Sequence, residues 1–223
     1  MKILLSFALI ALLPLAHAQE APTIKIRTLC FERDPSGIDK LVVFKEDKST
    51  VKLIFPESFP SQPEKVPVVN GSVFFHNPAQ LDAPPIAIAK IPAGIKEALI
   101  IFFPSTGTEP TTVYDTVVIN ASLKGIPEDG ALIMNIYSHD VRVVVGEHRI
   151  LLPPGKSTGV ARPKERNDYN MAAVVFQTEI NGQWTTIAET AIHFPPDQQQ
   201  FFLTYPDART KSLALRTYQI DTF

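Results

Sequence analysis

The residues whose spacing most suggests catalysis lie at Gly155–Gly159. This segment reads Gly-Lys-Ser-Thr-Gly, the G-x-S-x-G spacing of a serine nucleophile, and Asp168 and His193 follow it in the order serine, aspartate, histidine. In enzymes with this motif, a sharp strand-to-helix turn exposes the serine hydroxyl next to an oxyanion hole. Ser157 is therefore the candidate nucleophile of a small secreted serine hydrolase.

The residues that flank Ser157 argue against this chemistry. Pro153-Pro154 precede the motif and Val160–Pro163 follow it, and a flank of this composition does not form the required helix. A β-turn between two strands accounts for Gly155 and Lys156 without any catalytic role. We therefore predict no catalytic residue and keep the Ser157 hydrolase as the alternative.

The histidines and the single cysteine do not show the spacing of a metal site. No two of the histidines beyond the N-terminal segment form an H-x-H or H-x₃-H pair, although strands can bring distant ligands together. They are His76, His139, His148 and His193. Cys30 is the only cysteine, so no intrachain disulfide can form. Its apolar neighbours predict a buried, inert thiol rather than a reactive or intermolecular one. We expect neither a metal nor a cofactor.

Cations gather just after the Ser157 turn, at Arg162, Lys164 and Arg166. If the strands between Ala131 and Ile180 follow one another as a meander, these three residues and His148 meet at one end of the sheet. Such an end can hold an anionic polysaccharide with an affinity that falls with salt. Neighbouring acidic residues partly cancel the charge, so a solvated rim of mixed charge is the alternative.

Trp184 is the remaining candidate for ligand binding. It follows the Asn181-Gly182 turn, and an aromatic ring on the rim of a β-sandwich can stack on a sugar. The same ring can equally fill a core, so this assignment is also an expectation.

The first residues predict export. Lys2 is followed by the apolar run Ile3–Leu15, and Ala16-His17-Ala18 has the small-x-small pattern of a signal peptidase site. The apolar run of about 13 residues is short for a bilayer span. We predict a cleaved signal peptide over 1–18, no transmembrane segment after cleavage, and a periplasmic or secreted location.

The composition excludes several classes of protein. The formal net charge is −2, so no nucleic-acid partner is expected. Hydrophobic residues make up 45% and charged residues 20%, which excludes a disordered chain. Twenty prolines against ten glycines, clustered at the ends of apolar runs, favour many short strands.

Hydrophobic alternation predicts strands along the whole chain and no convincing helix. Ala131–Pro163 reads as four short strands separated by turns, which describes an antiparallel meander. Asn70-Gly71 and Asn181-Gly182 are the residues of two-residue hairpin turns. Val113–Ala121 is expected to be the first strand of the second half.

The polar segment Ser105–Thr112 is the best internal boundary. It predicts an N-terminal β-domain at 19–104, a linker at 105–112 and a C-terminal β-sandwich at 113–223, although one large domain remains open. Both halves contain an Asn-Gly turn, a hairpin that ends in an apolar residue followed by proline, and a late strand that ends in an aromatic residue followed by proline. The proline pairs are Phe55-Pro56 with Leu152-Pro153, and Phe103-Pro104 with Tyr205-Pro206. The halves are either related copies or unrelated β-rich segments with similar turns.

The strand spacing and the Leu152–Gly155 turn are similar to those of immunoglobulin-like and fibronectin-like sandwiches, without the Cys…Trp…Cys spacing of immunoglobulin domains. The expected fold is therefore an all-β, antiparallel β-sandwich. The expected function is that of a non-catalytic binding or structural module of the bacterial cell envelope, with an envelope protein or an anionic polysaccharide as partner. A further alternative is an accessory subunit whose exposed edge strands pair with a partner.

Overall fold

The computed structural model describes residues 22–35, 37–105, 112–121, 127, 129–207 and 209–221. Within these residues the chain forms sixteen strands and no helix, which confirms the predicted all-β class. Accordingly, the described part of the chain offers no helix that could cross a membrane. The predicted signal peptide and all but the two ends of the predicted linker lie outside the described residues.

The N-terminal sandwich contains eight strands in two sheets. In the first, β1 runs parallel to β7 and antiparallel to β4, and β7 pairs with β8, so the order is β4-β1-β7-β8. The hairpins β2-β3 and β5-β6 form the second sheet, connected by the bridge between Val42 and His76. The strands are β1 (Thr23–Cys30), β2 (Lys40–Phe44), β3 (Thr50–Ile54), β4 (Glu64–Pro67), β5 (Ser72–Phe75), β6 (Ala87–Lys90), β7 (Glu97–Pro104) and β8 (Tyr114–Asn120).

The C-terminal sandwich repeats this arrangement. One sheet has the order β12-β9-β15-β16, with β9 parallel to β15, and the other has the order β11-β10-β13-β14. The strands are β9 (Ala131–Asn135), β10 (Val141–Val145), β11 (His148–Leu152), β12 (Ser157–Val160), β13 (Met171–Ile180), β14 (Gln183–His193), β15 (Gln198–Pro206) and β16 (Leu213–Asp221).

The two sandwiches share one topology, strand for strand. β1 to β8 occupy the places that β9 to β16 occupy in the second copy, including the parallel pair at the centre of one sheet. Phe103-Pro104 and Tyr205-Pro206 end β7 and β15, which are equivalent strands. That the two halves are related copies stays a prediction, because sandwiches without sequence similarity also share this architecture.

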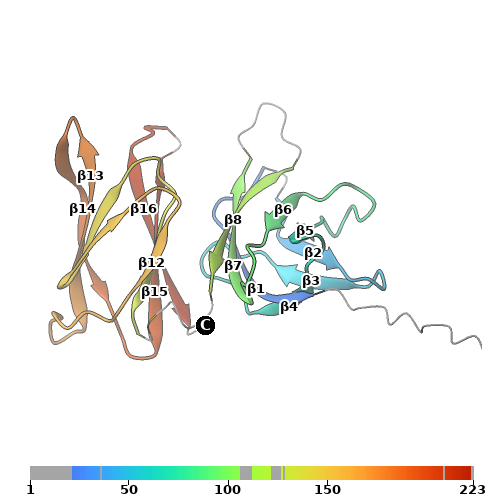
Figure 1. Cartoon of the computed structure of the whole chain (residues 1–223), viewed down its shortest axis with the longest axis horizontal. Coiled ribbons are helices and arrows are strands. Elements are labelled where there is room, and N and C mark those ends of the chain that lie inside the picture. Colours follow the sequence, from blue (N-terminus) through green and yellow to red (C-terminus); the bar gives the residue numbers. More distant parts are fainter. Residues whose placement is uncertain are drawn as a thin grey trace, which may run out of the picture.

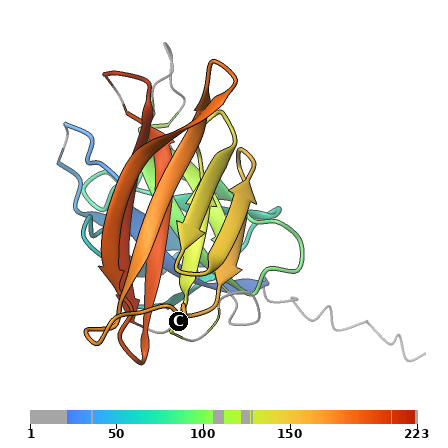
Figure 2. The same ribbon diagram turned by 90° about the vertical axis from the view of Figure 1, so that its left-hand side faces the viewer.

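The four sheets stack as layers, as Figure 1 shows from β13 and β14 at one side to β2, β3 and β5 at the other. Figure 2 views the outer C-terminal sheet face-on, with the N-terminal strands behind it. Three apolar clusters fill the spaces: one inside each sandwich, and a third between the sheets that contain β1 and β15. The middle layers are therefore covered on both faces, which explains buried runs such as Ala98–Phe102.

The predicted meander is wrong in its pairing. Of the four strands in Ala131–Pro163, only β10 and β11 form a hairpin, whereas β9 pairs with β12 and β15 in the other sheet. The loop at Ser138–Asp140 crosses between the sheets, and the Pro153–Gly155 turn crosses back. The buried side chain of Asn135 fixes both crossings, because its Nδ2 donates to the carbonyl oxygens of His139 and Leu152 at 2.9 and 2.8 Å.

Two further predictions about pairing need correction. Val113–Ala121 is not the first strand of the second half, because β8 pairs with β7 in the N-terminal sheet. The Asn70-Gly71 turn has the expected positive φ angles of 49° and 73°, but it connects β4 to β5 rather than closing a hairpin. β4 pairs with β1 instead of with β5, and a single β-bridge between Val69 and Ser72 forms at the turn.

Candidate binding site between two edge strands

The cationic end predicted from the sequence is present, but its central residue is used internally. The Arg162 side chain donates from Nε and Nη2 to the carbonyl oxygen of Phe194 at 2.9 and 2.7 Å, and from Nη2 to Asn170 Oδ1 at 3.2 Å. Its Nη1 lies 3.9 Å from Asp129 Oδ2. Arg162 therefore ties three loops together, and little of its guanidinium is left for a ligand.

Lys164, Arg166 and His148 lie at the same end around Glu147. The Glu147 carboxylate accepts hydrogen bonds from the backbone N–H groups of Lys164, at 2.8 and 3.0 Å, and Glu165, at 3.1 Å. The Lys164 bond is the main reason that the pKa of Glu147 falls to about 2. His148 Nε2 is 3.4 Å from Glu147 Oε1, and Arg166 Nε is buried. This arrangement anchors a loop, with a carboxylate at its centre.

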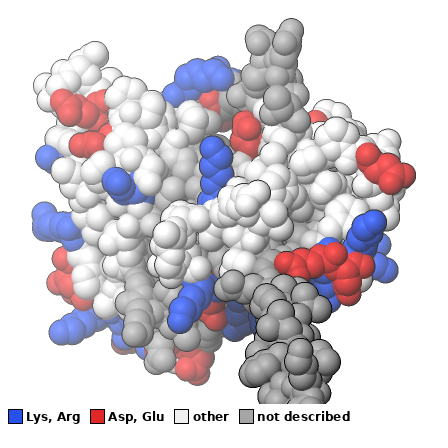
Figure 3. Space-filling model, turned by 45° about the vertical axis from the view of Figure 1, so that its right-hand side comes forward, with Lys and Arg blue, Asp and Glu red and all other residues white. Residues whose placement is uncertain are grey.

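Trp184 lies apart from that end, on the outer face of the β11-β10-β13-β14 sheet. The Arg142 guanidinium stacks over its ring, with Cζ 3.7 Å from the ring centroid. One face of the indole is therefore already covered by a cation and is closed to a sugar ring. On the face drawn in Figure 3, Lys and Arg residues are scattered among Asp and Glu residues, with no large patch of one sign in the part that the structure describes.

The candidate catalytic and metal-binding residues do not assemble into a site in the described structure. Ser157 is exposed at the start of β12, where Lys156 N donates to Pro153 O in a β-turn and no helix follows. No hydrogen bond connects Ser157 to Asp168 or His193 among the described residues. In the same part of the chain, no group of three His, Cys, Asp or Glu side chains could hold a metal ion. Cys30 is fully buried, as predicted, and burial raises its pKa to about 12.

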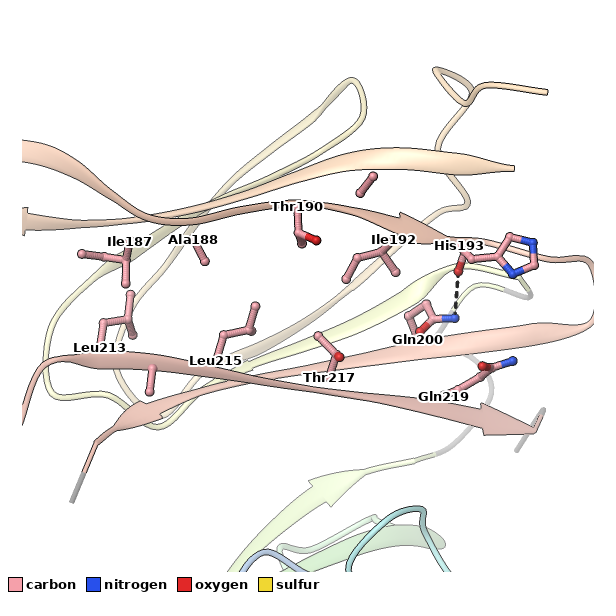
Figure 4. A pocket seen from close by; sticks show the side chains of 12 residues that line it. Ile187, Ala188, Thr190, Ile192, His193, Gln200, Leu213, Leu215, Thr217 and Gln219 are labelled. Atoms are coloured by element: carbon pink, nitrogen blue, oxygen red, sulfur yellow. Dashed lines mark hydrogen bonds between the residues drawn. The ribbon is translucent and has the colours of Figure 1, made fainter. Parts of the chain in front are cut away.

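A concave site lies along one side of the C-terminal sandwich, between the edge strands β14 and β16. It is a groove of about 690 Å³, and twelve residues line it. Figure 4 shows that Ile187, Ala188 and Ile192 of β14 point toward Leu213 and Leu215 of β16. We call this site the β14–β16 groove. Sequence reasoning missed it, because neither strand can be recognised as an edge before its partners are known.

The lining of the β14–β16 groove changes from apolar to polar along its length. Ile187, Leu213 and Leu215 form the apolar end, and His193, Gln200 and Gln219 form the polar end. Gln200 Nε2 donates to His193 O at 3.0 Å and closes the polar end. None of the twelve lining residues is Asp, Glu, Lys or Arg.

The equivalent side of the N-terminal sandwich is closed by the protein itself. Pro104 pairs with Tyr114 as Pro206 pairs with Leu213, so Tyr114 and Leu213 are equivalent positions. Tyr114 N donates to Ile86 O at 2.9 Å, and Thr116 Oγ1 donates to Ile88 O at 2.9 Å, which joins β8 to β6. The hollow above this seam contains the charged residues Lys90 and Asp115.

The edges at the groove also differ in length from the other edges of the four sheets. β14 and β16 have 11 and 9 residues, whereas β8 has 7 and β3, β4, β6, β11 and β12 have only 4 or 5. Several of these short edges carry lysine or proline, which discourage pairing with another chain, as at Lys52, Lys65 and Pro67. β14 and β16 contain neither lysine nor proline, so two long edges without these residues face each other across one groove.

Two comparisons with known proteins found no match. No protein-family model matches the chain, and no curated protein sequence is significantly similar to it. The fold and the groove define a class: a tandem pair of β-sandwiches with one open side.

Proposed function

We propose that the protein is an exported, non-catalytic binding module that holds its ligand in the β14–β16 groove. One observation carries this proposal: the same seam is closed by hydrogen bonds in the N-terminal sandwich and open in the C-terminal one. The lining supports the same conclusion, because ligand sites bind apolar parts of a ligand and orient it with a few polar groups.

The chemistry of the lining supports a neutral ligand. A charged group in this groove would lose hydration without meeting an opposite charge among the lining residues. This favours an uncharged segment of an envelope protein over an anionic polysaccharide as the partner.

Binding can be tested before the ligand is identified. A solvent-sensitive fluorophore attached to Thr217→Cys would lie in the groove, and Cys30 would not compete for the label because its thiol is buried with a pKa of about 12. We expect fractions of the source cell envelope to shift the emission of this label.

The matched control is a label at Thr186→Cys, which lies on β14 but on the outer face, where Thr186 accepts a hydrogen bond from Gln177. Its emission is expected to stay constant. Equal shifts at both positions, or none at Thr217 with any fraction, would contradict binding in the groove.

The export part of the proposal rests on the signal peptide that the sequence predicts over 1–18. N-terminal sequencing of protein recovered from the periplasm or the medium is expected to begin within a residue or two of Gln19. An intact Met1 on protein held in the membrane would contradict it.

A further inference from the structure

We infer that the occupant of the β14–β16 groove is an extended polypeptide segment that adds to β16 as the next strand after β12-β9-β15-β16. This inference rests on the proposed function, and it names the class of ligand and the edge that receives it. β-strand addition uses main-chain hydrogen bonds for affinity and pockets for alternate side chains for specificity.

The free edge of β16 presents its backbone groups toward the groove. Successive residues of a strand direct N–H and C=O to opposite sides. Ser212 O accepts a hydrogen bond from Asp207 N, so the backbone groups of Ser212 point toward the β15 side. The N–H and C=O groups of the alternate residues therefore point away from β15; these residues are Leu213, Leu215, Thr217 and Gln219. The N-terminal copy shows the same direction, because Tyr114 N, equivalent to Leu213 N, donates outward to Ile86 O.

β14 is the less suitable of the two edges. Its pairing with β13 shifts register between Phe176 and Gln177, which leaves Ile187 as an extra residue in a bulge. Bulges interrupt pairing along an edge. At the other end, the His193 carbonyl is already taken by Gln200. β16, in contrast, pairs with β15 without any register shift from Leu213 to Asp221.

The lining then selects the sequence of the incoming segment. A strand beside β16 places every second side chain in the groove, facing Ile187, Thr190 and Ile192 of β14. Large apolar side chains fit beside Leu213 and Leu215, and small hydroxyl or amide side chains fit toward the polar end. The class of ligand is therefore a strand of about seven to nine residues with uncharged alternate positions.

The first experiment is selection of random nonapeptides displayed on phage against the full-length protein. We expect enriched sequences to alternate, with uncharged residues at every second position. Thr217→Lys should reduce their binding at least tenfold by placing a charge in the groove, while Thr186→Lys on the outer face should leave it unchanged. Both positions are exposed, so neither variant is expected to affect folding.

The second experiment identifies the edge by residue-resolved hydrogen exchange with the best selected peptide. Bound peptide should slow exchange of the Leu215, Thr217 and Gln219 amides at least tenfold and leave the Glu189 and Ala191 amides of β14 unchanged. Protection of the β14 amides instead would overturn the assignment to β16, as would failure of any alternating peptide to enrich.

The outcomes separate this inference from the proposed function. Envelope fractions can be digested completely with protease before they are added to the labelled protein. If the Thr217 label still responds to them, the binding site is kept and a polypeptide ligand is excluded. A dimer that forms without peptide and is lost in Thr217→Lys would assign the edge to a second copy of the chain, against this inference. No response of the label to any fraction would remove the proposed function itself.

Discussion

Asn135 determines where the chain crosses between the sheets of the C-terminal sandwich. Its side chain is fully buried, and all of its hydrogen-bonding capacity is used. Besides the two bonds from Nδ2, Oδ1 accepts from Tyr137 N at 2.9 Å and from Thr204 Oγ1 at 3.0 Å. A residue without these groups would leave buried backbone groups unsatisfied, at a cost of about 1–3 kcal/mol each.

We therefore expect Asn135→Ala to lower the free energy of unfolding by about 3 kcal/mol or more. Ser157→Ala is the matched polar control, because Ser157 is exposed in a turn, and a change below about 0.5 kcal/mol is expected there. Urea unfolding of both variants measures the difference. A loss in Ser157→Ala as large as that in Asn135→Ala would contradict this account.

Glu147 gives the loop around Lys164 a predictable dependence on pH. Because its pKa in the folded protein, about 2, lies below the ordinary value of 4.5, the ionised form is the one bound in the fold. Its contribution is present above pH 4.5 and is lost as the pH falls toward 2. The amide resonances of Lys164 and Glu165 should titrate with a midpoint near pH 2, and Glu147→Gln should remove that titration. A midpoint near 4.5 would show that these hydrogen bonds do not hold the carboxylate.

At the scale of elements, the sequence predicts the strands far better than their partners. The Asn181-Gly182 hairpin turn is predicted and observed, and β14 (Gln183–His193) follows it, because the turn residues are a local signal. Partners depend on which face each strand buries, and alternation alone does not specify that. The sequence therefore predicts hairpin turns where the chain in fact crosses between the sheets, and it predicts pairing of β9 with β10, which lie in different sheets.

The candidate site was less predictable for the same reason. A groove between β14 and β16 exists only because both strands end their sheets, and this depends on the pairing of the whole copy. The charge of Arg162 marks it as a candidate in the sequence, but the sequence does not show that its guanidinium donates hydrogen bonds to the Phe194 carbonyl oxygen. Sequence thus locates the cations and leaves their use undetermined.

In the turn between β10 and β11, both the backbone conformation and the neighbouring loop after β12 restrict which residue can replace Gly146. Gly146 has a φ of 55°, and a Cβ there would lie 2.7 Å from Pro163 Cβ in the loop after β12. Gly155 has a φ of 70°, but its position is open, with nothing within 4 Å of an added Cβ. Backbone conformation alone costs about 1–2 kcal/mol at each position, so any further loss at Gly146 reports the contact with Pro163.

We expect Gly155→Ala to destabilise the protein by about 1 kcal/mol and Gly146→Ala by about 3 kcal/mol. Thermal unfolding measures both. Gly146→Ala should also displace the loop that Glu147 holds, and so shift the Lys164 and Glu165 amide resonances. Equal losses in the two variants would show that the Pro163 contact relaxes freely.

At the scale of the whole molecule, the two copies pack through equivalent sheets. Leu29, Leu99 and Ile101 of the N-terminal copy lie in one cluster with Met134, Phe201 and Leu203. The strand registers make these equivalent residues, as in the self-complementary interface of a symmetric dimer. At the edge of the cluster, Phe31 and Tyr205 lie edge-to-face with ring centroids 4.7 Å apart, and Arg216 stacks over Phe31 and donates to its carbonyl oxygen.

This shared cluster should make the two sandwiches unfold together. Each fully buried leucine, isoleucine or phenylalanine stabilises the folded state by about 1.5–3 kcal/mol, and neither copy keeps these side chains buried without the other. We expect calorimetry of the wild type to show one transition whose calorimetric and van 't Hoff enthalpies agree.

Leu203→Ala, in the cluster between the copies, should lower the free energy of unfolding by about 2–5 kcal/mol and split the transition in two, because it weakens the contact between the copies. Leu151→Ala is the control, since Leu151 is 54% exposed on the outer face, and it should keep a single transition. Two separate transitions in the wild type would show that the copies are independent domains and that their contact contributes little to stability.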